Sequence, residues 1–482
     1  MLFNSIDFAI FLPIVFFIYW FVLNKTIKIQ NIFIVIASYT FYSFWNWKFL
    51  ALIFLSTFTD YCVGLALDNE ENKTKRKIFL GISLIVNLGI LGFFKYYNFF
   101  IDNFIKIFSF FGQEIKPSSL NVILPVGISF YTFQTMSYSI DVYNKKIKPC
   151  RDFFAFASFV SFFPQLVAGP IERAKNLLPQ FIKKREFNYE KSVDGMRQIL
   201  WGLFKKIVIA DNCSEFVDLI FNNSSNLSGS TLALGAMLFA FQIYGDFSGY
   251  SDIAIGAARL FGINIMRNFN YPYFSRDIAE FWRRWHISLT SWFKDYLYIP
   301  LGGSRCNIWL KIRNTFAIFL VSGFWHGANW KFIAWGAINA IYFLPLLLTN
   351  KNRKNLDTIA KTRILPAPKE LIQMLVTFCL TVFAWIFFRA NNIDHGLSII
   401  SKIFSLSFFT IPNFDGREKA LELIIIICIF IAIEWLGREE QYAIARLENK
   451  LTKPLRYLFY YAIIATIFFF GGIEQQFIYF QF

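Results

Sequence analysis

Two apolar runs meet at a single histidine in residues 314–349, NTFAIFLVSGFWHGANWKFIAWGAINAIYFLPLLLT. The outer flanks of this stretch, 311–313 and 351–354, are both basic. Because basic loops stay on the cytoplasmic side, the stretch predicts a helical hairpin that starts and ends there. A helix rises about 18 Å between Asn314 and His326, which is roughly half the thickness of a bilayer core. We therefore expect His326 to lie at membrane depth, near the turn of the hairpin.

His326 is the first candidate for chemistry. Ionisable side chains at membrane depth usually have a function, and imidazole titrates near neutral pH, so it can take a proton and give it back as a general base. Gly323 and Gly327 flank the histidine and allow close approach of the backbone. The alternative is a buried structural histidine that is hydrogen-bonded by carbonyl groups at the end of a helix.

The composition extends the membrane interpretation to the whole chain. Of the 482 residues, 56% are hydrophobic and 17% are charged, whereas soluble domains carry about 25% charged residues. This balance excludes a soluble enzyme, a disordered protein, a fibre and a disulfide scaffold. The six cysteines are scattered and form no CxxC pair, so no metal site is expected. We predict an all-α polytopic membrane protein with a single domain over residues 1–482.

Apolar runs of spanning length occur throughout the chain. The first, 6–23, lacks the basic start and small-residue cleavage site of a signal peptide, and we expect it to be retained. Four other segments, 99–111, 153–168, 252–265 and 278–300, suit interfacial or re-entrant helices. The predicted spans are 6–23, 31–45, 48–67, 78–97, 121–141, 198–221, 230–250, 314–328, 330–349, 371–388, 421–436 and 457–474.

The basic residues define an orientation. With both termini outside the cytoplasm, the inner loops hold 36 of the 48 Lys and Arg residues and the outer loops hold six. This asymmetry is typical of the positive-inside rule. It explains the net charge of +16 without any nucleic acid partner, and it makes the lipid bilayer the main surroundings of the chain.

The segment 277–300 carries the second histidine, His286. Asp277 and Glu280 resemble a capping box, which predicts a helix that starts at Ile278. The apolar stripe of this helix comprises Ile278, Trp282, Trp285, Leu289, Trp292, Phe293 and Tyr296, and its polar face comprises Arg283, Arg284, Ser291, Lys294 and Asp295. Such a helix lies in the membrane interface, where its basic face attracts an anionic, phosphate-bearing substrate. His286 then lines a cytoplasmic entrance or, alternatively, only packs among tryptophans.

Several polar residues are further candidates. The run Gln242–Asp252 contains Asp246 and Asp252 in apolar surroundings, where carboxylates cap broken helices or line a polar channel. His395 lies in a polar outer loop and is expected to be a solvated surface histidine. The residues that we expect to line a channel are Asp246, Ser251, Trp285, Trp325 and Asn329.

Four segments together resemble a known family. They are Phe163–Ile171, Tyr244–Asp252, Phe281–Ser288 and Gly323–Gly327. In this order they resemble the membrane-bound O-acyltransferases, and within that family the alginate O-acetylase and peptidoglycan O-acetyltransferase A branch. The resemblance extends over about the whole chain, and it is the order of the four motifs that makes it specific.

The resemblance implies a fold and three catalytic residues. It implies a ring of transmembrane helices around a thin centre, with a cytoplasmic and an extracytoplasmic funnel that meet at His326. His286 matches the second histidine of this branch. The ending Phe477–Phe482 is similar to its C-terminal aromatic motif, in which Tyr479 would accept the acyl group. Extended, this tail spans about 20 Å, which is enough to reach the middle of the membrane. The alternative for the tail is an aromatic anchor at the membrane interface.

The implied function is O-acetyl transfer across a bacterial inner membrane. Acetyl-CoA would be the cytoplasmic donor, with Arg283, Arg284 and Lys294 at its entrance, and a periplasmic SGNH-type acetyltransferase would receive the acetyl group. A composition rich in Lys, Asn, Ile and Phe suggests an AT-rich genome, which favours peptidoglycan as the polymer. Alginate or another exported polysaccharide is the alternative. D-alanyl transfer to teichoic acids is disfavoured because the tyrosine motif is fused to this chain. A transporter or flippase is a different class, but the sequence lacks the paired repeats of transporters.

Overall fold

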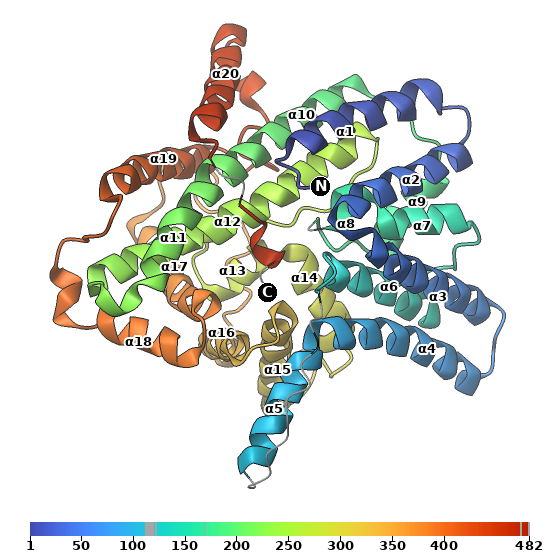
Figure 1. Ribbon diagram of the computed structural model, residues 1–482, viewed down its shortest axis with the longest axis horizontal. Coiled ribbons are helices and arrows are strands. Elements are labelled where there is room, and N and C mark those ends of the chain that lie inside the picture. The colour runs from blue at the N-terminus through green and yellow to red at the C-terminus, as the bar shows by residue number, and fades with distance from the viewer. Residues whose placement is uncertain (111–119, 121–122, 168, 473–474, 481–482) are drawn as a thin grey trace. The chain divides into compact units, whose positions relative to one another are not determined.

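The computed structural model describes residues 1–110, 120, 123–167, 169–472 and 475–480. Regular structure in these residues is helical throughout (Figure 1), which confirms the predicted all-α class. They divide into two compact units, Met1–Ser192 with Ala257–Ile265, and Val193–Gly256 with Met266–Phe482. The single domain and the ring of helices around a thin centre stay predictions.

The first unit contains the helices of the N-terminal part of the chain. Its interior is polar where α3, α4 and α6 pack together. The Asp60 carboxylate there accepts hydrogen bonds from Asn87, at 2.6 Å, and from the Ser83 and Ser139 hydroxyls. These hydrogen bonds offset the cost of burying the carboxylate. The helices are α1 (Ile6–Phe17), α2 (Ile27–Asn46), α3 (Leu50–Asp68), α4 (Lys73–Leu91), α5 (Tyr97–Phe110), α6 (Ile128–Tyr143), α7 (Phe153–Ser161), α8 (Phe163–Leu166) and α9 (Ala174–Ile182).

The second unit holds the candidate site. The π-helical segment η4 (Phe204–Asp211) follows α10, and α10 and α12 contain residues of both units. The helices are α10 (Tyr189–Leu203), α11 (Asn212–Asn222), α12 (Gly229–Leu260), α13 (Ile278–Arg284), α14 (Ile287–Phe293), α15 (Ile308–His326), α16 (Trp330–Leu348), α17 (Pro368–Arg389), α18 (Ile393–Ile403), α19 (Arg417–Leu436) and α20 (Lys453–Phe470).

Every predicted span overlaps a helix, although 123–127 and 471–472 are not helical and residues 121, 122, 473 and 474 lie outside the described residues. In the part of the chain that the structure describes, four helical stretches are long and apolar enough to cross a bilayer on their own, namely Ile27–Asp68, Lys73–Phe110, Trp330–Leu348 and Pro368–Arg389. The first stretch joins two of the predicted spans. Length alone does not distinguish these stretches from the rest, because α12 has 32 residues and is not among them.

One boundary is wrong. The sequence predicts a span at 230–250 and a separate segment at 252–265, but α12 runs unbroken from Gly229 to Leu260. Gly249 in this run does not break the helix, and it allows close backbone packing against α10. A Cβ atom on Gly249 would lie 2.8 Å from the carbonyl oxygen of Gly202. Asp246 therefore does not cap a broken helix.

The predicted hairpin at 314–349 is confirmed as α15 and α16. A Cβ atom on Gly323 would lie 2.2 Å from the carbonyl oxygen of Phe332, so the two helices touch through their backbones, as expected at this glycine. Asn329 begins α16, because its side chain accepts a hydrogen bond from the backbone N–H of Lys331 at 3.0 Å. His326 is the last residue of α15.

Candidate active site

His326 lies at the turn of this hairpin and is buried. Its imidazole packs against Trp335 and Phe388, with ring centroids 5.2 Å and 5.3 Å away. Trp325, the preceding residue, lies 5.0 Å from it. These aromatic walls exclude water from most of the ring. Close packing of these rings restricts the orientation of the imidazole.

His286 lies between two short helices rather than inside a single one. The predicted helix over 278–300 is wrong, because α13 ends at Arg284 and α14 starts at Ile287. His286 joins them with φ 43° and ψ 54°, the left-handed region that residues other than glycine rarely adopt. Its side chain is buried. Strained backbone of this kind is concentrated at functional sites.

The cause of this break is remote in sequence. The backbone N–H of Ile287 donates to the carbonyl of Asn268 at 2.9 Å, and the N–H of Asn270 donates to the carbonyl of Arg284 at 2.9 Å. Segment 268–270 therefore takes over backbone groups that would otherwise continue the helix. The predicted capping box is half confirmed. Asp277 accepts from the N–H of Glu280 at 2.7 Å, whereas the Glu280 carboxylate accepts from the N–H of Arg276.

Asn268 also determines the tautomer of His286. Its Oδ1 accepts from the backbone N–H and the hydroxyl of Ser288, at 3.3 Å and 2.9 Å, and its Nδ2 donates to the Ser251 hydroxyl at 3.2 Å. Because a backbone N–H can only donate, the Asn268 atom that faces the N–H of Ser288 must be the oxygen Oδ1 and not the nitrogen Nδ2. Nδ1 of His286 lies 3.1 Å from this same oxygen, so Nδ1 carries the proton. Nε2 is then the basic nitrogen of the ring.

Tyr479 lies between the two histidines. Its ring centroid is 5.5 Å from that of His326 and 6.3 Å from that of His286. Phe247 of α12 packs against the tyrosine at 4.5 Å and against His286 at 4.6 Å. Figure 1 shows the C-terminal segment, in red, beside α12 of its own unit. Gln481 and Phe482, the last residues of the predicted tail, lie outside the described residues.

A cavity of about 50 Å³ borders both histidines. Its walls come from α13, α14, α15 and the link between α13 and α14, and they are mostly aromatic, with Leu289, Thr290, Ile318 and Ser322 between the rings. Space of this size exceeds the roughly 10–15 Å³ that a single water needs. The site therefore has room for a small group beside the two imidazoles.

The predicted basic face is not formed on one helix. Arg283 and Arg284 belong to α13, whereas Lys294 is exposed and begins the next segment, η7 (Lys294–Tyr298). Arg283 donates to the carbonyls of Asn352 and Asn355, both at 2.7 Å. Its role in binding a donor stays a prediction, but in the structure it holds the loop that precedes α17.

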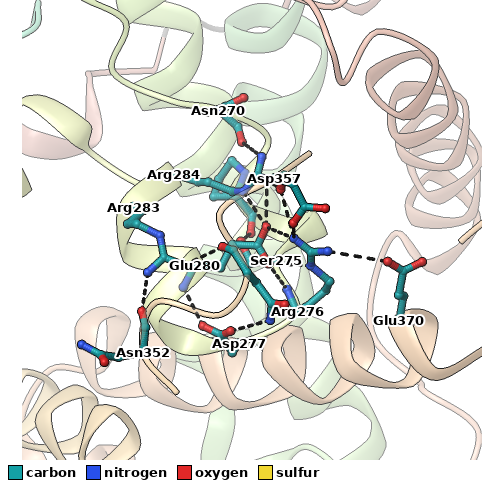
Figure 2. A network of polar contacts seen from close by, with 12 residues as sticks. Asn270, Ser275, Arg276, Asp277, Glu280, Arg283, Arg284, Asn352, Asp357 and Glu370 are labelled. Atoms are coloured by element: carbon teal, nitrogen blue, oxygen red, sulfur yellow. Dashed lines mark hydrogen bonds and ion pairs between the residues drawn. The ribbon is translucent and has the colours of Figure 1, made fainter. Parts of the chain in front are cut away.

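Arg284 belongs to a buried ionic network (Figure 2). Its guanidinium lies 2.8 Å from Glu280, which also pairs with Arg276 at 3.0 Å. Arg276 reaches Asp357 at 2.9 Å, and this hydrogen bond holds the pKa of Asp357 below its usual value. The network therefore fastens the 352–357 loop to α13.

The predicted channel-lining residues separate into two groups. Trp285 borders the cavity, and Trp325 contacts both histidines, at 5.0 Å and 6.1 Å. Ser251 is linked to His286 through Asn268. Asn329 caps α16. Asp246 contacts Lys206 and the tail rather than the histidines.

His395 is half-buried at the start of α18. Its Nε2 lies 2.9 Å from the Ser224 hydroxyl, and its Nδ1 accepts from the N–H of Asn391 at 3.1 Å. It therefore stabilises a connection between α17 and α18, and it is less solvated than expected.

Sequence reasoning missed Asn268 and Lys206. No local pattern distinguishes Asn268, because its partners lie 17 to 20 residues away. Lys206 did carry a signal, since it follows Lys205 inside the predicted span 198–221, and charged residues at membrane depth are rarely without a role.

These features define a polytopic membrane protein with a buried histidine site. The sequence matches the membrane-bound O-acyltransferase family model over residues 39–387, and the chain belongs to this family. A probable alginate O-acetylase of Azotobacter vinelandii is 36% identical over 446 residues, covering 92% of this chain and 86% of its own. A peptidoglycan O-acetyltransferase of Helicobacter pylori is 37% identical, covering 84% of this chain and 80% of its own. A teichoic acid D-alanyltransferase of Streptococcus thermophilus is 28% identical, covering 59% of this chain and 72% of its own.

Proposed function

We propose that the protein takes an acetyl group from cytoplasmic acetyl-CoA and passes it through Tyr479 across the inner membrane. A periplasmic transferase of the SGNH type then uses it to O-acetylate peptidoglycan. The contact of Tyr479 with both His326 and His286 carries this proposal. Family membership favours acyl transfer over a transporter or flippase.

The chemistry of the first step balances within the site. His326 takes the proton of the Tyr479 hydroxyl, and the phenol oxygen bonds to the carbonyl carbon of the thioester. The C–S bond breaks, and the leaving thiolate takes the proton back from the imidazolium. A phenol has a pKa near 10 and a thiol near 8.5, so the phenol ester keeps much of the transfer potential. In the second step a nucleophile of the partner accepts the acetyl group and the phenol is restored.

The small cavity supports acetyl as the group that is transferred. Its volume of about 50 Å³ suits two carbons and an oxygen beside the histidines. Trp282, Phe293 and Phe319 close it with rigid rings. Longer acyl chains would need these aromatic walls to move, which is costly in a close-packed interior.

Peptidoglycan is proposed as the final acceptor because the composition of the chain, rich in Lys, Asn, Ile and Phe, suggests an AT-rich genome. Relatives named for alginate and for peptidoglycan are about equally similar to it, so similarity does not discriminate between them. Alginate or another exported polysaccharide is the alternative outcome. Analysis of the polymers of a producing cell for O-acetyl groups, with and without the gene, distinguishes the two.

The first prediction concerns the acylated tyrosine. After incubation with acetyl-CoA, the intact mass of the wild-type protein should rise by one acetyl group, carried on the C-terminal peptide. His326→Ala and Tyr479→Phe should each remove this adduct. Tyr479→Phe keeps the ring and its packing, so it is the matched control for the anchor alternative. A fully active Tyr479→Phe enzyme would refute the carrier and indicate direct transfer from the donor to an external hydroxyl.

A further inference from the structure

Two buried ion pairs join η4 to α12 in the second unit. Lys205 pairs with Asp252, and Lys206 pairs with Asp246 at 2.9 Å and with Asp211 at 2.8 Å. The side chains of Lys206 and Asp246 are only 1% and 4% exposed. Charges buried in this way at membrane depth are costly and are usually retained for a function.

The π-helical geometry of η4 makes both pairs possible. Successive residues point in more similar directions in a π-helix than in an α-helix, so Lys205 and Lys206 can both face α12. The helices approach closely there, since a Cβ atom on Gly249 would lie 3.1 Å from the backbone nitrogen of Lys206. π-helical segments are frequent at functional sites.

Of the two ion pairs, only the Lys206–Asp246 pair contacts the C-terminal segment 475–480 in the described residues. Nζ of Lys206 donates to the carbonyl of Gln475 at 3.1 Å, and Oδ2 of Asp246 accepts from the N–H of Ile478 at 2.7 Å. These two contacts enclose Phe477, which is fully buried against Tyr250 at 4.3 Å. The residue after Ile478 is Tyr479.

The helix that leads to this segment is weakly packed. Ile463 is the one buried residue of α20, and the last carbonyl of this helix, that of Phe470, accepts a hydrogen bond from Asn212 at 3.2 Å, nine residues before Tyr479. The ion pair and the Phe477 contact therefore set the register of the tail. Both polar contacts are to the main chain, so they do not depend on whether Tyr479 carries an acyl group.

We propose that Asp246 and Lys206 form a clamp that binds the backbone of residues 475–478 and thereby positions Tyr479 between His286 and His326. The inference rests on the proposed function of Tyr479 and adds the residues that position it. When the tail leaves, Asp246 keeps Lys206 as its partner, so no charge is left buried alone. The clamp is thus suited to repeated binding and release.

Hydrogen–deuterium exchange of the full-length protein tests the clamp directly. In Asp246→Asn, the single side-chain oxygen of the asparagine accepts the hydrogen bond from the Lys206 ammonium. The side-chain NH₂ group then faces the N–H of Ile478, and two donors cannot form a hydrogen bond. We expect exchange at the Ile478 amide to rise about tenfold or more, because a hydrogen bond to a charged acceptor is lost. Asp252→Asn is the matched control, since it disturbs the neighbouring pair on the same elements and should leave the tail protected.

A second variant leaves the buried ion pair untouched. Ile478→Pro removes the donated N–H at the first position of a helical turn, where proline is tolerated, and Ile478→Val keeps it. Ile478→Pro should slow acetylation of Tyr479 while the exchange of α10 and α12 stays at the wild-type level. Asp246→Asn should lower the maximal rate of Tyr479 acetylation and change the KM for acetyl-CoA by less than about twofold, because the donor is bound elsewhere.

The outcomes separate the clamp from the proposed function. The clamp is overturned if the tail amides other than that of residue 478 keep their wild-type protection in both Asp246→Asn and Ile478→Pro, even if Tyr479 is acetylated. If protection is lost in both variants but wild-type Tyr479 carries no acetyl group, the clamp is supported and the carrier function is refuted. Equal loss of protection in Asp252→Asn would mean that the ion pairs only hold the helices together.

Discussion

At the scale of single residues, Asn268 links the strained backbone of His286 to the protonation of its ring. The same side chain accepts from Nδ1 of His286 and from Ser288, and it donates to Ser251. A histidine whose tautomer is fixed in this way presents one defined basic nitrogen. Asn268 is therefore a positioning residue that acts through His286.

Replacing Asn268 tests this role. Asn268→Leu keeps the approximate volume but removes the acceptor, and we expect acyl transfer to fall by about a hundredfold, as when other histidine-orienting partners are lost. Asn268→Asp should recover most of the activity, because its carboxylate can accept from His286, from Ser288 and from the Ser251 hydroxyl. Single-turnover acetylation of Tyr479 is the measurement. Equal losses in both variants would show that Asn268 only supports packing.

At the scale of elements, the α15–α16 hairpin determines where His326 lies. The helices touch at Gly323, three residues before the histidine, and the atom that a Cβ would meet is a backbone oxygen. Backbone cannot move aside as a flexible side chain can, so any added atom must push α16 away from α15.

Gly323→Ala should therefore destabilise the protein by about 1–3 kcal/mol, the usual cost of overpacking, and should reduce activity by displacing His326. Gly89→Ala in α4 is the control, because nothing lies within 4 Å of its Cβ position. This helical replacement should stabilise by up to about 1 kcal/mol. Thermal unfolding in detergent measures both. A Gly323→Ala protein as stable as the wild type would mean that the hairpin can adjust.

The same two elements show what the sequence can and cannot predict. The hairpin and His326 were predictable because apolar length, basic flanks and glycine spacing are all local to 311–354. The break at His286 was not, because residues 278–296 form an unbroken helical stripe, and the interruption comes from backbone bonds to segment 268–270. The hydrogen bond between Asp246 and the N–H of Ile478 was not predictable either, because the two residues are 232 positions apart in the sequence.

At the scale of the whole molecule, the uneven distribution of basic residues predicts the direction of transfer. The loops assigned to the cytoplasm hold 36 of the 48 Lys and Arg residues, and counting the spans puts the C-terminus on the opposite side. The donor would therefore approach from one face of the membrane, and the tail that carries Tyr479 would enter from the other. An enzyme of this kind moves an acetyl group across the bilayer without moving the cofactor.

Membrane vesicles of defined orientation test this direction. Acetyl-CoA does not cross a bilayer, so in inverted vesicles, which expose the cytoplasmic face, added acetyl-CoA should acetylate Tyr479. Right-side-out vesicles should give no adduct until detergent opens them, and permeabilised samples of both kinds should then react equally. Tyr479→Phe gives the background in each case. If the acetyl-tyrosine is discharged outside, a membrane-impermeant hydroxylamine derivative added outside right-side-out vesicles that were loaded with acetyl-CoA should remove the label. Equal labelling of intact vesicles in both orientations would contradict the predicted topology, and would require donor and acceptor to meet from the same side.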